Sequence, residues 1–208
     1  FSLSYADNLW TVDLPVSSIT LGPGASQDFT VSVTVPADAL AGAMDTVTIN
    51  AASITDPGVT AEAEINTYAN AIYDIDLTPA TATMAGDPGD VVTYILTLTN
   101  LGNSDVTVDL AASGNLWDVN LPVTSYPLAV GASGELTVEV TIPADALVDD
   151  QDVVTITATS TGGVEKTSVL TTTVTPIIID LTPATATMSG DPGDVITYIL
   201  TLTNQGTS

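Results

Sequence analysis

The sequence predicts an all-β fold, a series of two-sheet Greek-key β-sandwiches, on the strength of three observations. Apolar and polar residues alternate along short runs, as expected for strands with one buried face. Clusters of Gly, Pro, Asn and Asp separate these runs and are typical of turns. The runs recur about one hundred residues apart, which indicates a tandem repeat of one small domain.

The repeat is clearest in residues 76–100 and 180–204, which are 104 positions apart and differ at only two of 25 positions. A second set of motifs recurs 107 positions apart. Its members are Asn8-Leu9-Trp10 with Asn115-Leu116-Trp117, Gly24-Ala25-Ser26 with Gly131-Ala132-Ser133, and residues 36–40 with residues 143–147.

These offsets divide the chain into the back of one repeat (1–71), a complete repeat (72–176) and the front of the next (177–208). Ser208 aligns with Ser104 and Phe1 aligns with Val108, so the two partial repeats together make almost one domain. Three interpretations stay open, one of which is that the two ends of the sequence have no structural meaning. The chain is one period of a long array, which we favour, or a subunit whose tail completes the head of the next subunit.

The complete repeat predicts about seven strands. Alternation is cleanest at Val92, Tyr94, Leu96 and Leu98, which share one face of a strand. The expected strands lie near residues 72–77, 91–100, 106–112, 117–121, 135–142, 153–160 and 164–174. Residues 143–147 are expected to form one helical turn that crosses between the sheets. Short strands in this number favour an immunoglobulin-like sandwich in each repeat.

The repeats join without a flexible linker. Val174, Thr175, Pro176 and Ile177 connect the complete repeat to the next one, with no Gly or Ser between them. The last strand of one repeat is expected to run almost directly into the first strand of the next. The sequence therefore predicts a rod with limited bending.

Composition excludes several classes of function. The chain has 25 acidic residues and one cation, Lys166, for a net charge of −24. Such a surface repels nucleic acids and anionic lipids, and it attracts divalent cations. No apolar run approaches the roughly 20 residues that a bilayer span needs, and no signal peptide is evident. Cys, His and Arg are absent, which leaves no disulfide and no Ser/His/Asp or Cys/His nucleophile.

The order of motifs resembles the immunoglobulin-like tandem repeats of bacterial surface proteins, of the NEW3-type and DUF11/CARDB-like groups. The resemblance rests on three motifs: Pro88-Gly89-Asp90 before the strand at 91–100, Asn115-Leu116-Trp117, and residues 143–147. It covers essentially the whole chain. It implies a spacer role in stalks, adhesins, surface layers, filaments or modules beside glycoside hydrolases, and it brings no catalytic residues.

Acidic turns are the candidate sites for calcium, the one cofactor that the sequence suggests. Carboxylates and carbonyls in loops suit a hard cation. The turn at 86–90 supplies Asp87 and Asp90, and its copy supplies Asp191 and Asp194. The alternative, which we favour, is a Pro-Gly turn whose Asp side chains cap backbone donors. A carboxylate pair also suits glycoside hydrolysis, but a turn repeated in tandem is more simply structural.

A second acidic cluster is a weaker calcium candidate. It consists of Asp149, Asp150 and Asp152. The matching positions in the first repeat are Gly42, Ala43 and Asp45, so only one carboxylate of the cluster recurs.

Two further kinds of residue are candidates for binding sugars or carrying them. Trp10 and Trp117 recur at matched positions and are either sugar-stacking platforms or, as we favour, core residues. Outward-facing threonines are either O-glycan sites or, as we favour, ordinary solvent-facing strand residues. They include Thr93, Thr97, Thr99, Thr137, Thr141, Thr155 and Thr157.

The sequence as a whole predicts a non-catalytic extracellular structural protein, a rod-like component of a cell-surface filament, stalk or layer. Its expected partners are identical chains, associated head to tail or side by side, with divalent cations or O-linked glycan in addition. A spacer in a large adhesin or secreted enzyme is the alternative. A carbohydrate-binding accessory module is a more distant one.

Overall fold

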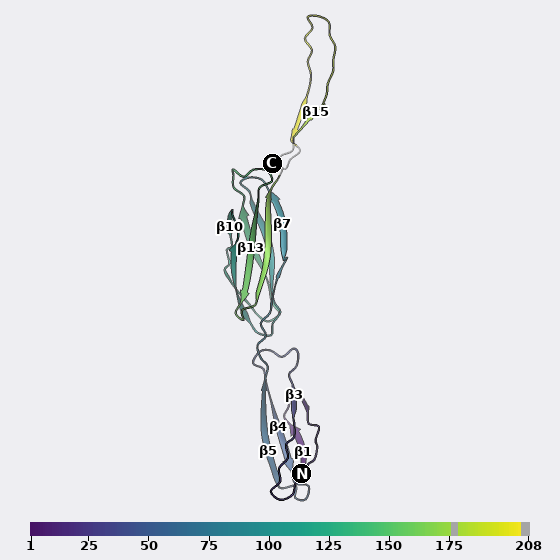
Figure 1. Cartoon of the computed structure of the whole chain (residues 1–208), viewed down its shortest axis with the longest axis vertical. Coiled ribbons are helices and arrows are strands. Elements are labelled where there is room, and N and C mark those ends of the chain that lie inside the picture. The colour runs from purple at the N-terminus through teal and green to yellow at the C-terminus, as the bar shows by residue number, and fades with distance from the viewer. Residues whose placement is uncertain (176–178, 205–208) are drawn as a thin grey trace.

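The computed structural model describes residues 1–175 and 179–204, which contain sixteen strands and no helix. Within these ranges, therefore, there is no apolar helix that would cross a membrane. Three parts follow one another along the long axis of the molecule (Figure 1). We call residues 1–71 the N-terminal unit, residues 75–174 the middle sandwich and residues 179–204 the C-terminal strand pair.

The middle sandwich consists of two sheets. The first has the order β10 (Asp118–Asn120), β12 (Ser133–Thr141), β8 (Val91–Asn100) and β6 (Ile75–Thr78), all antiparallel. The second has the order β11 (Ser125–Leu128), β9 (Val106–Ser113), β13 (Gln151–Ser160), β14 (Glu165–Val174) and β7 (Thr81–Gly86). Its neighbours are antiparallel except β7, which runs parallel to β14.

This strand order is the immunoglobulin arrangement. In an immunoglobulin domain, strands A, B, E and D form one sheet and strands C, F and G form the other. Here β6, β8, β12 and β10 take the first four places, and β9, β13 and β14 take the other three. The predicted all-β, immunoglobulin-like sandwich is confirmed for the middle part of the chain.

The predicted count of seven strands is wrong, because the middle sandwich has nine. The two extra strands, β7 and β11, lie at the two edges of the second sheet. β7 has no clear apolar alternation, since an edge strand buries little of its surface. β11 contains Pro127, which a sheet tolerates only at an edge and which argues against a strand when read from sequence.

The predicted helical turn at residues 143–147 is also wrong. Two successive tight turns lie there instead, closed by hydrogen bonds from Ala146 N–H to Pro143 O (3.1 Å) and from Asp150 N–H to Leu147 O (3.0 Å). Asp149 has a φ of 68°, in the left-handed region, which ends any helical path. The segment still crosses between the two sheets, from β12 to β13.

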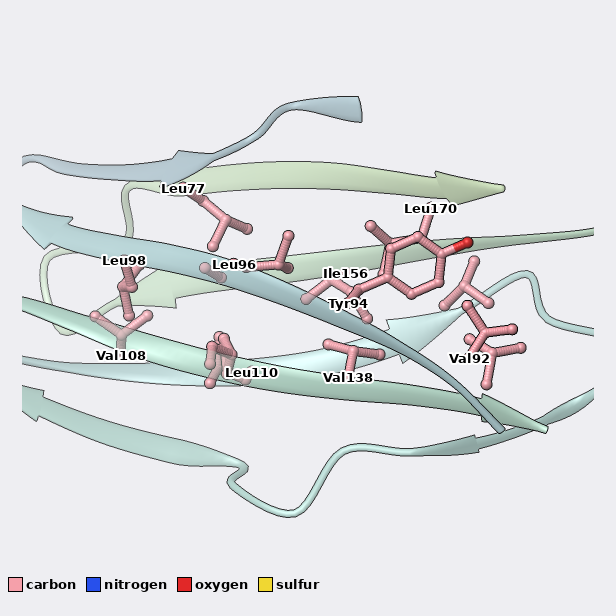
Figure 2. Close-up of a cluster of buried hydrophobic side chains, with 14 of the residues drawn as sticks. Leu77, Val92, Tyr94, Leu96, Leu98, Val108, Leu110, Val138, Ile156 and Leu170 are labelled. Atoms are coloured by element: carbon pink, nitrogen blue, oxygen red, sulfur yellow. The ribbon is translucent and has the colours of Figure 1, made fainter. Parts of the chain in front are cut away.

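The core of the middle sandwich forms from the inward-facing positions of both sheets (Figure 2). β8 supplies Val92, Tyr94, Leu96 and Leu98, and its outward residues alternate with them. Each fully buried aliphatic side chain stabilises the fold by about 1.5–3 kcal/mol relative to exposure. The outward threonines of these strands are exposed or half-buried, as solvent-facing strand residues are.

The two outer parts of the chain have far smaller cores. The N-terminal unit has one sheet of β1 (Ser2–Ala6), β4 (Met44–Ala52) and β5 (Thr60–Tyr68), and a second of β2 (Thr11–Asp13) and β3 (Ser32–Thr34). Its buried cluster contains Val12, Val47 and Ile49. The C-terminal strand pair joins β15 (Ile179–Thr182) to β16 (Thr201–Asn204), and its apolar side chains are exposed.

Candidate functional site

The acidic turn at 86–90 uses its carboxylates to bind the protein's own polar groups, one on the backbone and one on a side chain. The carboxylate of Asp90 accepts a hydrogen bond from Asp87 N–H at 2.9 Å, and Asp90 N–H donates to Asp87 O at 3.0 Å. The Asp87 carboxylate accepts a hydrogen bond from the Thr175 hydroxyl. Gly89 has a φ of 92°, which the turn requires and which favours glycine.

The copy of this turn in the C-terminal strand pair has the same geometry. The Asp194 carboxylate accepts from Asp191 N–H at 2.9 Å, and Asp194 N–H donates to Asp191 O at 3.0 Å. These bonds are the capping geometry that the sequence left as the alternative to calcium.

The three aspartates of the second cluster have different surroundings. The Asp150 carboxylate accepts from Leu147 N–H at 2.8 Å and is exposed, whereas Asp152 is buried. Among the described residues, no three acidic side chains converge as a metal site would require. Calcium binding by either cluster stays a prediction.

Asp152 belongs to a different arrangement, which the sequence reasoning missed. One oxygen of its carboxylate accepts from Leu116 N–H at 2.8 Å, and the other accepts from Trp117 N–H at 3.2 Å. The carboxylate thereby fixes the loop before β10 from the neighbouring sheet. We call this pair of hydrogen bonds from two successive backbone amides to one carboxylate the clamp.

Asp45 forms the same clamp in the N-terminal unit. Its carboxylate accepts from Leu9 N–H at 2.7 Å and from Trp10 N–H at 3.2 Å, and the residue is buried. The available signal was that Asp45 and Asp152 are 107 positions apart, the same offset as the two Asn-Leu-Trp motifs.

The tryptophan of the Asp152 clamp lies beside the core of the middle sandwich. Trp117 is half-buried and packs against the buried cluster of the middle sandwich. The side chain of Asn115 donates to Trp117 O at 2.9 Å, and Asn8 donates to Trp10 O at 2.8 Å. Leu116, in contrast, is 85% exposed at the loop tip.

Tyr94 connects the two sheets through its hydroxyl. The hydroxyl donates to Thr171 O at 2.7 Å and lies 2.9 Å from Thr172 Oγ1, both on β14. Burial raises the pKa of Tyr94 above its ordinary value, and the hydrogen bond with Thr172 opposes that rise. Tyr94 is therefore a neutral anchor between β8 and β14.

Asn103 joins the N-terminal unit to the middle sandwich. Its side-chain amide donates to Ala39 O at 2.9 Å and to Asn70 O at 3.0 Å, and its carbonyl oxygen accepts from Ile72 N–H at 2.7 Å. Its backbone carbonyl accepts from Ala41 N–H at 2.9 Å. A Cβ on the adjacent Gly102 would lie 2.2 Å from Ile72 O, so only glycine fits beside this joint.

The N-terminal unit has an open apolar groove between its three-stranded sheet and the segment 19–29. The groove has a volume of about 270 Å³, and its lining includes Phe1, Leu3, Leu21, Phe29 and Ala51. Charged residues are absent from this lining.

Comparisons with known proteins show neither a family nor a close relative. No family model and no curated protein matches the sequence. One similar structure is a PapD-like domain of human CEP192, with a TM-score of 0.40 and 12% identity over 48% of this chain and 84% of that one.

Two other similar structures cover about half of this chain as well. A family 123 glycoside hydrolase from Clostridium perfringens has a TM-score of 0.41 and 11% identity over 50% of this chain and 27% of its own. The periplasmic chaperone SfaE has a TM-score of 0.38 and 10% identity over 49% of this chain and 58% of its own. Similarity this weak assigns no ligand, partner or activity.

Proposed function

We propose that this chain is a non-catalytic structural protein of the cell surface, a rod built from tandem immunoglobulin-like repeats that forms part of a filament, stalk or layer. The observation that carries the proposal is the joint at Asn103. Three hydrogen bonds through the side chain and backbone of this residue tie the N-terminal unit to the middle sandwich, and a fourth holds the connecting residue Ile72. A joint held in this way favours a fixed end-to-end arrangement of the units over units connected by a flexible linker.

The division into repeats at 1–71, 72–176 and 177–208 is part of the proposal. The N-terminal unit repeats the clamp, the tight turns and the strand order of the back of the middle sandwich. The C-terminal strand pair repeats the sequence of its front. Each copy then supplies the same mechanical element.

The surface composition supports an exposed location. With Lys166 as its one cation, the chain offers a single site to trypsin-like proteases, and that residue lies within β14. A net charge of −24 keeps neighbouring rods apart laterally. Contacts at the ends of the rod are then favoured over contacts along its sides.

Electron microscopy and small-angle X-ray scattering of the 208-residue chain test the proposal. We expect uniform, extended particles in which the N-terminal unit and the middle sandwich keep one angle. Particles with freely varying angles between the units would contradict a rod and favour a flexible spacer in an adhesin or secreted enzyme.

A further inference from the structure

The middle sandwich has four edge strands, and among these described strands β7 alone has an unprotected edge. The edges are β10 and β6 in the first sheet, and β11 and β7 in the second. Proteins protect sheet edges with charged residues, proline or very short strands. β10 has three residues and contains Asp118, β6 contains Asp76, and β11 contains Pro127. β7 has six residues, with no charged residue and no proline.

The free edge of β7 presents the backbone groups of alternate residues. On the paired side, Gly86 O accepts a hydrogen bond from Thr175 N–H at 2.9 Å, at the end of the parallel register with β14. Even-numbered residues of β7 therefore turn their N–H and C=O groups toward β14. Because this direction alternates along a strand, Thr81, Thr83 and Ala85 turn theirs toward the free edge. All three residues are exposed.

The surroundings of this edge are uncharged as well. Thr83 lies beside Thr171 of β14, and Ala85 lies beside Thr173. Met84, on the opposite face of the strand, is 43% exposed and adds apolar area at the edge. On a chain with a net charge of −24, a side without carboxylates allows a second copy of the same chain to approach closely.

We propose that β7 pairs in antiparallel sense with β7 of a second copy, about a twofold axis at Thr83. The two five-stranded sheets then form one continuous sheet, as in strand addition at other exposed edges. A strand that pairs with its own copy makes an isologous contact, which closes at two chains. β7 lies at one side of the middle sandwich (Figure 1), so this inference goes beyond the proposed function by adding a lateral contact to the end-to-end arrangement.

The free backbone groups determine the register of this contact. In an antiparallel pair, residues that exchange two backbone hydrogen bonds recur at every second position. The register that uses all three free residues of each strand places Thr83 opposite Thr83 of the second copy and Thr81 opposite Ala85. Met84 then lies opposite Ala82 on the other face.

This register also separates the nearest carboxylates. Asp87 follows β7 and is four positions from Thr83, so the twofold axis places the two copies of Asp87 on the order of 27 Å apart along the strands. The Debye length at physiological ionic strength is about 8 Å, so this repulsion is largely screened. The other charges of the chain still repel, and we expect a weak dimer that strengthens with added salt.

Single cysteines test the register, because the chain has no cysteine of its own. In a glutathione redox buffer, Thr83→Cys is expected to form a disulfide-linked dimer by itself, since paired Cα atoms about 5.5 Å apart suit a disulfide. Thr81→Cys and Ala85→Cys are each expected to form little dimer alone and several-fold more when mixed with each other.

Thr93→Cys, exposed on β8 of the first sheet, is the matched control and gives the yield of random encounters. A Thr83→Cys yield no higher than that of the control would overturn the proposal. Equal yields for the mixture and for its two components alone would overturn the antiparallel register.

A proline at the axis tests the backbone pairing. The N–H of Thr83 faces the free edge, so Thr83→Pro removes a donor from the contact between copies and none from the pairing with β14. Sedimentation velocity of the whole chain is expected to show loss of the dimer in Thr83→Pro and its retention in Thr83→Val. Circular dichroism checks that both variants stay folded. Equal self-association in the two variants would contradict pairing through β7.

The salt dependence supplies an independent measurement on the unmodified chain. Raising the NaCl concentration from about 0.05 M to about 0.5 M is expected to increase the dimer fraction, because salt screens the repulsion between acidic chains. A chain that stays monomeric at millimolar concentration in both salts would overturn this inference. The proposed rod would be unaffected, because its test is the angle held at Asn103.

Discussion

The carboxylate of Asp152 accepts a hydrogen bond from the backbone N–H of Leu116 at 2.8 Å, across the two sheets of the middle sandwich. Asp45 and Leu9 repeat this contact at 2.7 Å in the N-terminal unit. Because the carboxylate is buried and its partners are backbone amides, the contact fixes the loop before β10. The same hydrogen bond therefore occurs in both the N-terminal unit and the middle sandwich.

Removing the clamp should destabilise the middle sandwich. Asp152→Ala is expected to lower the free energy of unfolding by about 2–3 kcal/mol, because two amides lose a charged acceptor in a buried site. The measurement is urea unfolding followed by circular dichroism. Asp145→Ala, at an exposed turn position, is the control and should change stability by less than about 0.5 kcal/mol. Equal losses in both variants would contradict the clamp.

Removing the side chain at the joint should loosen the rod without unfolding its parts. Asn103→Ala is expected to widen the distribution of angles between the N-terminal unit and the middle sandwich, because three side-chain hydrogen bonds are lost. Electron microscopy of single particles measures that distribution. Ser104→Ala is the matched control, since its hydroxyl makes only a long contact to Asp105 O. An unchanged distribution would show that other contacts hold the joint.

A substitution in the acidic turn at 86–90 tests whether its carboxylates cap backbone donors or bind calcium. Asp90→Ala is expected to lower stability by about 1 kcal/mol through loss of the bond from Asp87 N–H. Capping predicts the same loss in calcium and in EGTA. A calcium site predicts that calcium raises the melting temperature of the unmodified chain more than magnesium does, and that Asp90→Ala removes the difference. Thermal unfolding in the three conditions separates the two hypotheses.

Substitution of Trp117 tests whether this side chain is a core residue or a surface on which sugars stack. Trp117→Ala is expected to cost roughly 2 kcal/mol, because the indole packs on the core while remaining half-buried. Leu116→Ala, at the exposed loop tip, should have almost no effect on stability. Glycan-array binding that disappears with Trp117→Ala would instead favour the carbohydrate-binding alternative.

Burial of Tyr94 predicts a dependence on alkaline pH. Its folded-state pKa is raised, so its contribution to stability is fully present below its ordinary pKa of about 10 and is lost as pH rises above that value. The free energy of unfolding should therefore fall more steeply above pH 10 in the unmodified chain than in Tyr94→Phe. Parallel pH profiles for the two chains would contradict this role.

Much of the fold could be predicted from the sequence because strand alternation is a local signal. The alternation in β8 predicts one buried face within a single strand, formed by Val92, Tyr94, Leu96 and Leu98. Turn residues indicate where the strand ends. Edge strands such as β7 and β11 escaped prediction because one flank of each faces solvent and their identity depends on a neighbour distant in sequence. The same reason explains residues 143–147, where a short motif compatible with a helix forms two turns instead.

By itself, the sequence determined the all-β class, the repeat and the inward faces of most strands, since these follow from periodicity and from self-similarity. Only the tertiary structure decided which carboxylates are exposed caps and which are buried clamps, because Asp150 and Asp152 differ in the partners that the fold brings to them. It also decided that Phe29 lies beside an apolar groove of the N-terminal unit. Burial depends on what packs from outside the segment, and no local pattern records that.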